Sequence, residues 1–429
     1  MSFLKKLIEK IFQSPLITGS FVLFIGSSFA SFGSYLYHLL MGRMLGPVGY
    51  GELESVIAIL YLLIIIGTTL TLVVAKFIAD LKGKENLGGI NFLLSYFNRQ
   101  LFIYGGLLCL LLIAISPLIA LFLRLDSVVP LIFASFSFFI GLLLALNRGV
   151  LQGLLRFKEL SASSICENGL KVIIATALVF FGFWVQGAVL ALFLAGFIAF
   201  VFTLFLLRSV RRISPKKPDF NKKIFVSFAI PVFLANLSFT SLYTADIILV
   251  KHFFPSYEAG LYAALSVLGK IIFFGSSPIT MVMFPMVANH RSQGKNYRYL
   301  LNTAILLVLI ICFGINVVYF LLPKLMVLLL FGSNYLAASW LVGWMGIFIS
   351  TYALGYLFIN FFLSTEKIKA VVFPILASLG QIVLISLFHS SLFQVIQVSI
   401  AISGLLLLSL MLYYRYDKTK ASLGYRSRL

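Results

Sequence analysis

The chain has 429 residues, of which 61% are hydrophobic and only 11% are charged. A soluble domain has about 45–50% apolar and about 25% charged residues, so this chain has too few polar side chains to cover a water-facing surface. The composition therefore excludes a soluble domain and predicts a protein embedded in lipid. The net charge of +20 would suggest a nucleic-acid partner in a soluble protein, so its location along the chain has to be established first.

Twelve apolar stretches are long enough to cross a bilayer, which takes about 20 mostly apolar residues. They cover residues 16–40, 53–79, 100–123, 128–152, 160–182, 184–208, 224–250, 258–287, 299–322, 335–363, 369–388 and 391–414. The sequence therefore predicts an all-α integral membrane protein with about 12 transmembrane helices.

The segment that precedes the first span is amphipathic. Leu4, Leu7 and Ile11 share one helical face, with Lys5 and Lys6 opposite them. This pattern predicts an interfacial helix over residues 1–15, lying on the inner leaflet. A full-length span follows without a small-residue cleavage site, so we interpret the segment as a helix and not as a cleaved signal peptide.

The basic residues gather in alternate loops. With the loops assigned to two sides, 25 of the 33 Lys and Arg residues lie on the side of the N-terminus and 4 on the other. Because cytoplasmic loops carry the excess of Lys and Arg, we predict a multi-pass protein of the cytoplasmic (inner) membrane with both termini in the cytoplasm. The positive charge then serves topology and contact with anionic membrane lipids, and no nucleic-acid partner is expected.

A polar, basic stretch, SVRRISPKKPDFNKK (209–223), divides the spans six and six. It predicts an N-lobe over 16–208, a cytoplasmic linker over 209–223, a C-lobe over 224–414 and a basic cytoplasmic tail over 415–429. Segments of the two halves match at offsets close to 210: 41–60 with 250–272, 121–136 with 329–344, and 151–163 with 360–372. Six spans per half give a parallel repeat, of the kind whose two lobes enclose a central cleft and rock around it.

Five ionisable residues lie well inside the predicted spans: Arg148, Glu167, Lys171, Asp246 and Lys270. Each costs about 2.5–3.5 kcal/mol at mid-membrane on insertion scales, so such residues usually face the bundle interior or a water-filled cavity. Lys171 and Lys270 have similar depths in different halves. Together with Arg148 they predict a positively charged site for an anionic substrate such as a phosphate or pyrophosphate. Two alternatives stay open: Lys171 pairs with Glu167 at i, i+4, or Arg148 extends to the interface.

Three further predictions concern polar groups near these cations. Asp246 and Glu167 are candidates to carry a coupling cation, although Asp246 can instead pair with Lys270. Asn236, Thr240 and Tyr243 form a polar stripe on the seventh span. Asn236 is our candidate for substrate binding, and a hydrogen bond between helices is the alternative for this stripe.

The sequence offers no catalytic constellation. The four His and three Cys residues are scattered, and none has metal-ligand or redox spacing. We therefore predict no enzyme activity, no metal site and no cofactor. Transport would be driven by a Na⁺ or H⁺ gradient, by the substrate gradient, or by exchange.

Four motifs in order resemble the polysaccharide transporter family: GRMLGPVGYGELESV (42–56), LQGLLRFK (151–158), GLYAALSVLGKI (260–271) and LFGSNYLAAS (330–339). That family contains the O-antigen and exopolysaccharide repeat-unit flippases, in the superfamily of multidrug extrusion pumps and the lipid II flippase. The resemblance implies two six-helix lobes in a V shape around a central cationic cavity. It also implies that the substrate is a polyprenyl-diphosphate-linked oligosaccharide, flipped by alternating access for cell-surface polysaccharide biosynthesis. Polysaccharide polymerase or glycosyltransferases would be its partners.

Three alternatives remain. A cation-coupled exporter of small amphipathic compounds shares the scaffold but needs acidic residues at depth, whereas the deep charges counted here are three basic to two acidic. A membrane glycosyltransferase or polymerase needs sizeable outer loops, which this chain lacks. A non-transporting assembly subunit is the last alternative.

Overall fold

The computed structural model describes residues 15–217, 222–293 and 295–426. These parts of the chain contain helices and no β-strand. The predicted interfacial helix over 1–15 lies outside the described residues except for Pro15. The all-α membrane fold is confirmed.

The first half of the chain forms α2 (Pro15–Gly83), α3 (Leu87–Gln100), α4 (Gly106–Leu123), α5 (Val129–Gly153), α6 (Phe157–Phe180), α7 (Trp184–Leu206) and α8 (Arg208–Arg211). A π-helical turn, η1 (Leu101–Gly105), joins α3 to α4. The second half forms α9 (Lys222–Leu242), α10 (Ala245–Phe253), α11 (Ser256–Ser292), α12 (Arg298–Leu321), α13 (Pro323–Leu330), η2 (Ser333–Leu341), α14 (Val342–Ser364), η3 (Ile368–Val371), α15 (Val372–Leu387) and α16 (Leu392–Arg426).

Among the described residues, ten helices are long and apolar enough to cross a membrane, or eleven if α9 and α10, bent by 42°, form one span. The first of these, Gly26–Gly83, has 58 residues and a non-helical backbone at Gly46 (φ 65°, ψ 178°). A span needs about 20 residues, so this helix is long enough for both of the first two predicted spans.

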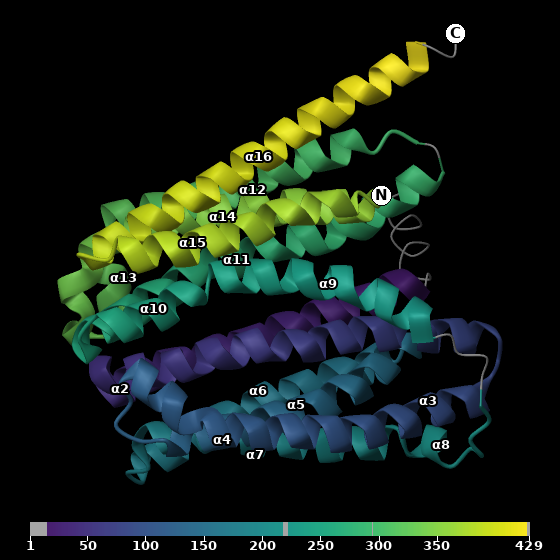
Figure 1. Ribbon diagram of the computed structural model, residues 1–429, viewed down its shortest axis with the longest axis horizontal. Helices are drawn as coiled ribbons and strands as arrows, with labels where there is room; N and C mark the ends of the chain where they lie inside the picture. The colour runs from purple at the N-terminus through teal and green to yellow at the C-terminus, as the bar shows by residue number, and fades with distance from the viewer. Residues whose placement is uncertain (1–14, 218–221, 294, 427–429) are drawn as a thin grey trace, which may run out of the picture. The chain divides into compact units, whose positions relative to one another are not determined.

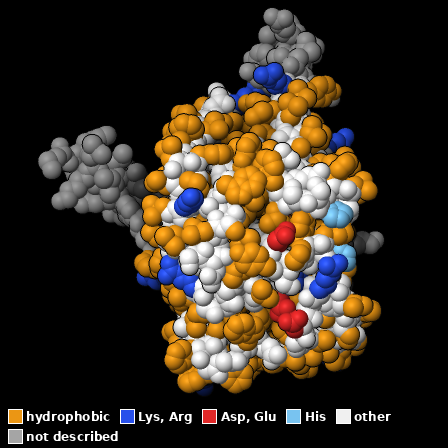
Figure 2. All heavy atoms as spheres, turned by 90° about the vertical axis from the view of Figure 1, so that its left-hand side faces the viewer, with side chains coloured by type: hydrophobic (Ala, Val, Ile, Leu, Met, Phe, Trp, Pro, Cys, Tyr) orange, Lys and Arg blue, Asp and Glu red, His pale blue; other side chains and the backbone are white. Residues whose placement is uncertain are grey.

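Large apolar side chains cover much of the surface. Leu121 and Phe180 are 78% and 79% exposed, and Figure 2 shows hydrophobic side chains over most of the face in view, with scattered charged ones. A soluble monomer rarely exposes such wide apolar areas, whereas lipid covers them without cost.

Contacts divide the chain into two compact units. Unit 1 comprises Met1–Leu45 and Leu63–Phe233, and unit 2 comprises Gly46–Leu62 and Leu234–Leu429. The middle of α2 thus packs with the later part of the chain, although chain order places it in the first half. The predicted lobe boundaries at 208 and 224 stay a prediction.

Unit 1 is held by close packing of its helices. Figure 1 shows α5, α6 and α7 side by side, and they pack on one another. A Cβ added to Gly153 of α5 would lie 2.6 Å from the Ala75 carbonyl oxygen of α2, so only glycine permits this approach. Asn91 of α3 donates its Nδ2 hydrogens to the carbonyls of Arg211, at the end of α8, and of Ile213. These bonds fix the beginning of the predicted linker on unit 1.

Unit 2 packs α11 and α16 on α14, and α15 on α16 (Figure 1). The part of α2 that belongs to unit 2, Gly46–Leu62, approaches α11 closely at Gly260. A Cβ on Gly260 would overlap the Pro47 carbonyl oxygen, so only glycine permits this approach. Left-handed residues recur at matching places of the two halves. Leu155 and Glu366 have φ of 60° and 58°, and Arg124 and Gly332 have φ of 51° and 94°. Their spacing agrees with the offset near 210 found in the sequence and supports the repeat.

Candidate functional site

The deep charges of unit 1 lie on α5 and α6. Arg148 Nη2 forms an ion pair with Glu167 Oε2 at 2.7 Å, and Ser163 Oγ accepts hydrogen bonds from Arg148 Nε and Nη2 at 3.2 and 3.1 Å. The two charged side chains are 19% and 29% exposed. Glu167 is therefore neutralised by Arg148 of the neighbouring helix.

Lys171 lies one helical turn beyond Glu167 on α6. Its Nζ donates to Ser34 Oγ at 3.1 Å and lies 5.0 Å from the ring centre of Tyr37, both on the first part of α2. The Tyr37 hydroxyl donates in turn to the Ala188 carbonyl of α7 at 3.0 Å. The structure thus brings Lys171, Arg148 and Glu167 together as one half-buried group in unit 1.

Unit 2 holds its deep lysine in a different environment. Lys270 on α11 is only 6% exposed. Its Nζ lies 5.4 Å from the ring centre of Tyr243, which directly follows α9, and 5.5 Å from that of Tyr61 on α2. A desolvated ammonium over an aromatic face gains about 2 kcal/mol, which offsets part of the cost of burying the charge.

Asp246, in the first turn of α10, is fully buried. Its Oδ2 accepts a hydrogen bond from the Tyr262 hydroxyl at 2.8 Å, and its Oδ1 accepts one from the Ile247 amide at 2.9 Å. The Asp246 carboxylate also acts electrostatically on Lys270.

Glu54 is the residue that the sequence analysis missed. It lies on the middle segment of α2, is fully buried, and acts electrostatically on Lys270 and on Tyr61. It stands at the second position of the predicted span 53–79 and adds a third carboxylate to the two that the sequence analysis counted at depth. The structure also buries Glu52 and Lys251 in unit 2, with 8% and 1% exposure.

Tyr61 and Tyr243, the rings near Lys270, belong to a larger aromatic cluster. Tyr243 contacts Tyr352 and Phe273 with ring centres 5.5 and 6.2 Å apart, and Phe273 contacts Tyr352 and Tyr356 at 5.2 and 5.3 Å. The full cluster consists of Tyr61, Phe239, Tyr243, Phe273, Tyr352 and Tyr356. Tyr243 belongs to the polar stripe that the sequence predicted on the seventh span, and Asn236 of that stripe is half-buried on α9.

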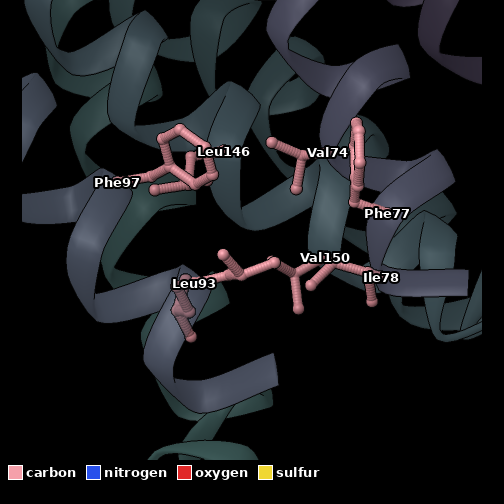
Figure 3. A pocket seen from close by; sticks show the side chains of 8 residues that line it. Val74, Phe77, Ile78, Leu93, Phe97, Leu146 and Val150 are labelled. Atoms are coloured by element: carbon pink, nitrogen blue, oxygen red, sulfur yellow. The ribbon is translucent and has the colours of Figure 1, made fainter. Parts of the chain in front are cut away.

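The pocket in Figure 3 is not a candidate for this site. It lies in unit 1 and is lined by Val74, Phe77, Ile78, Leu93, Leu94, Phe97, Leu146 and Val150. Every lining side chain is apolar, most belong to the core of unit 1, and the space between them fits no water molecule. Within the described ranges, no three His, Cys, Asp or Glu side chains gather closely enough to hold a metal ion.

Known proteins resemble this chain in sequence and in fold. A family model described as polysaccharide biosynthesis protein matches residues 40–340, more than half of the chain. An uncharacterised membrane protein of Methanocaldococcus jannaschii is 26% identical over 161 residues, which cover 34% of this chain. The match spans 38% of that relative's length.

Among solved structures, an inward-facing multidrug resistance transporter of the MATE family superposes with a TM-score of 0.76 at 14% identity, covering 91% of this chain and 95% of the other. The lipid II flippase MurJ in an inward closed conformation has a TM-score of 0.73 at 15% identity, with coverages of 92% and 87%. A MOP superfamily transporter from Pyrococcus furiosus, whose binding pocket is described as having reverse polarity, has a TM-score of 0.62 at 18% identity, with 95% coverage of both chains. At these identities the structures establish a common fold.

Proposed function

Because the chain belongs to the polysaccharide biosynthesis family, we propose that it is a flippase for a polyprenyl-diphosphate-linked oligosaccharide repeat unit. It would move this lipid across the cytoplasmic membrane by alternating access, for cell-surface polysaccharide biosynthesis. The activity makes and breaks no covalent bond. The observation that carries the proposal is Lys270, a lysine kept 6% exposed deep in a span and beside aromatic rings. A buried cation of this kind suits the diphosphate, since lysine serves as a point charge for phosphate.

The carboxylates of unit 2 suggest how a coupling cation would act. Asp246 and Glu54 are buried carboxylates that act electrostatically on Lys270, and a buried carboxylate is costly where its charge is not neutralised. A Na⁺ or H⁺ taken up at Asp246 would weaken the competition for Lys270, so the diphosphate would bind more tightly. By linkage, the diphosphate would raise the affinity for the cation equally. Glu167, which already pairs with Arg148, is the corresponding candidate in unit 1.

The other substrate-binding candidates supplement Lys270. Arg148 and Lys171 are half-buried cations whose partners, a carboxylate and hydroxyls, a diphosphate could replace. Asn236 of α9 offers an amide seven residues before Tyr243. Both termini would lie in the cytoplasm, and a polysaccharide polymerase or glycosyltransferases would be the protein partners.

Deletion of the gene tests the proposed function. We expect a lipid-linked oligosaccharide to accumulate in the inner leaflet and the surface glycan to be lost, with both restored by the wild-type gene. Normal glycan without accumulation would contradict the proposal. Lys270→Gln, expressed at the wild-type level, should fail to complement. If that variant does not accumulate in the membrane, the double variant Lys270→Gln with Glu54→Gln provides the same test. It removes a buried carboxylate together with the lysine.

Glu54 favours a second candidate, a cation-coupled exporter of small amphipathic compounds. Two buried carboxylates beside aromatic rings are suited to an organic cation. The exporter would bind a cationic dye such as ethidium in place of undecaprenyl diphosphate, and Glu54→Gln would weaken that binding.

A further inference from the structure

We propose that the aromatic cluster of unit 2 binds a sugar ring of the lipid-linked oligosaccharide and selects among glycans. This inference rests on the proposed function, because it concerns the substrate of the same site. It adds a specificity role for Tyr61, Tyr243 and Tyr356, beside the charge of Lys270.

The cluster has an inner and an outer layer. Phe239 and Tyr352 are buried, with 3% and 2% exposure, and they pack as a base. Tyr61, Tyr243 and Tyr356 are less completely buried than these two residues. They come from α2, the turn after α9, and α14, three segments that are distant in sequence. Rings fixed by a packed base lose little conformational freedom when a ligand arrives, which favours binding.

The polar groups around the rings distinguish a sugar from a lipid chain. Thr240 of α9 lies three residues before Tyr243, and Asn360 lies one turn from Tyr356 on α14, with both residues partly exposed. Asn360 Nδ2 donates to the Tyr356 carbonyl at 2.8 Å, which holds the amide beside that ring. A sugar presents C–H groups on its face and hydroxyls around its rim, so it fits an aromatic face bordered by amides and hydroxyls. An isoprenoid chain has no hydroxyls and would offer these polar groups no further hydrogen bond.

Lys270 fixes the place of the sugar relative to the rings. Its Nζ lies within 5.5 Å of the ring centres of both Tyr61 and Tyr243. A diphosphate bound at Lys270 therefore brings the sugar that is attached to it next to those rings. Lys270 and the rings would then contact adjoining parts of one ligand. The lysine would bind every diphosphate lipid, whereas the rings would bind only those lipids that carry a sugar.

Binding of matched lipids to the full-length protein in nanodiscs tests the inference. The probes are undecaprenyl diphosphate and the same lipid carrying one glucose, galactose or N-acetylglucosamine. We expect wild type to bind at least one glycosylated probe about tenfold more tightly than the bare lipid. Tyr356→Leu and Tyr243→Leu should each reduce this preference to about twofold or less, and Tyr356→Leu, which keeps both rings near Lys270, should leave the affinity for the bare lipid within about twofold of wild type.

Three controls separate this inference from the proposed function. Tyr356→Phe keeps the ring and should keep most of the preference. Tyr257→Leu removes an exposed tyrosine of unit 2 outside the cluster and should change nothing. Lys270→Gln should weaken all probes alike. If wild type binds every probe equally, or if the Tyr→Leu variants keep the preference, the sugar role is overturned while the flippase proposal stands. If wild type binds no diphosphate lipid at all, the proposed function fails and this inference with it.

Discussion

The two units bury their charges in opposite ways. In unit 1, Arg148 and Glu167 form a direct ion pair that is 19% and 29% exposed, and Lys171 is satisfied by a serine hydroxyl and a ring. In unit 2, Lys270, Asp246 and Glu54 are almost fully buried, and tyrosine rings and a tyrosine hydroxyl surround them. The ion pair of unit 1 is partly exposed, whereas the charged groups around Lys270 in unit 2 are buried. Unit 2 is therefore the part of the molecule in which binding of an anion or a cation should change the energy most.

The largest expected difference comes from the same substitution in each unit. Lys270→Leu leaves two buried carboxylates without their lysine and should lower the free energy of unfolding by about 3–5 kcal/mol. Lys171→Leu removes a half-buried cation bound to a hydroxyl and should cost about 1 kcal/mol or less. Thermal unfolding of both variants in the same detergent measures the difference. Equal losses would remove the contrast between the units.

A pair of tyrosine variants sharpens the comparison. Tyr262→Phe removes a hydrogen bond to the Asp246 carboxylate, and a bond to a charged group contributes about 1.5–3 kcal/mol. Tyr37→Phe removes a hydrogen bond to a backbone carbonyl and should cost about 0.5–1.5 kcal/mol. Both tyrosines are buried, so thermal unfolding compares them directly. A larger loss for Tyr37→Phe would mean that Asp246 is not charged in the folded protein.

Glycine variants test whether packing, and not charge, distinguishes the units. Gly260→Ala in unit 2 and Gly153→Ala in unit 1 both force a methyl group onto a backbone carbonyl, and each should cost about 1–3 kcal/mol. Gly314→Ala on α12 meets nothing within 4 Å and should leave stability unchanged or raise it. Yield of monodisperse protein and thermal midpoint serve as the readouts. A marked loss in only one unit would locate the difference in packing.

The smallest effect is expected for the ion pair of unit 1. A double-mutant cycle with Arg148→Gln and Glu167→Gln should give a coupling energy of about 1 kcal/mol, which decreases as salt is added, because both groups are partly exposed. A coupling of about 3 kcal/mol or more would show that this pair is as strongly desolvated as the cluster of unit 2.

The fold could be read from the sequence because membrane spans leave a strong signal. Apolar runs of span length predict where the helices lie, and alternating basic loops predict their direction, before any contact is known. The segment 46–62 shows the limit. Its hydrophobicity predicts a helix, but which unit it joins depends on the close approach of Pro47 and Gly260, which are far apart in sequence.

The site was predicted less completely. Arg148, Lys171, Lys270 and Asp246 stand out because charges are rare in apolar spans. Their partners could not be predicted. The i, i+4 spacing on α6 suggested that Glu167 pairs with Lys171, but the packing of α5 on α6 brings Arg148 to Glu167. The aromatic cluster left no signal either, because 44 Phe and 19 Tyr residues are spread over the whole chain. Only the three-dimensional contacts identify the six rings that form the cluster beside Lys270.

Direct binding of undecaprenyl diphosphate to the purified protein in nanodiscs tests the central claim, that the buried lysine of unit 2 receives an anionic lipid headgroup. We predict that wild type binds this lipid, that addition of Na⁺ or a lower pH strengthens the binding, and that Asp246→Asn removes this dependence. Lys270→Gln should lose at least about tenfold in affinity, whereas Lys270→Arg should retain most of it. Equal affinity of wild type and Lys270→Gln, or binding of ethidium but not of the diphosphate lipid, would contradict the account.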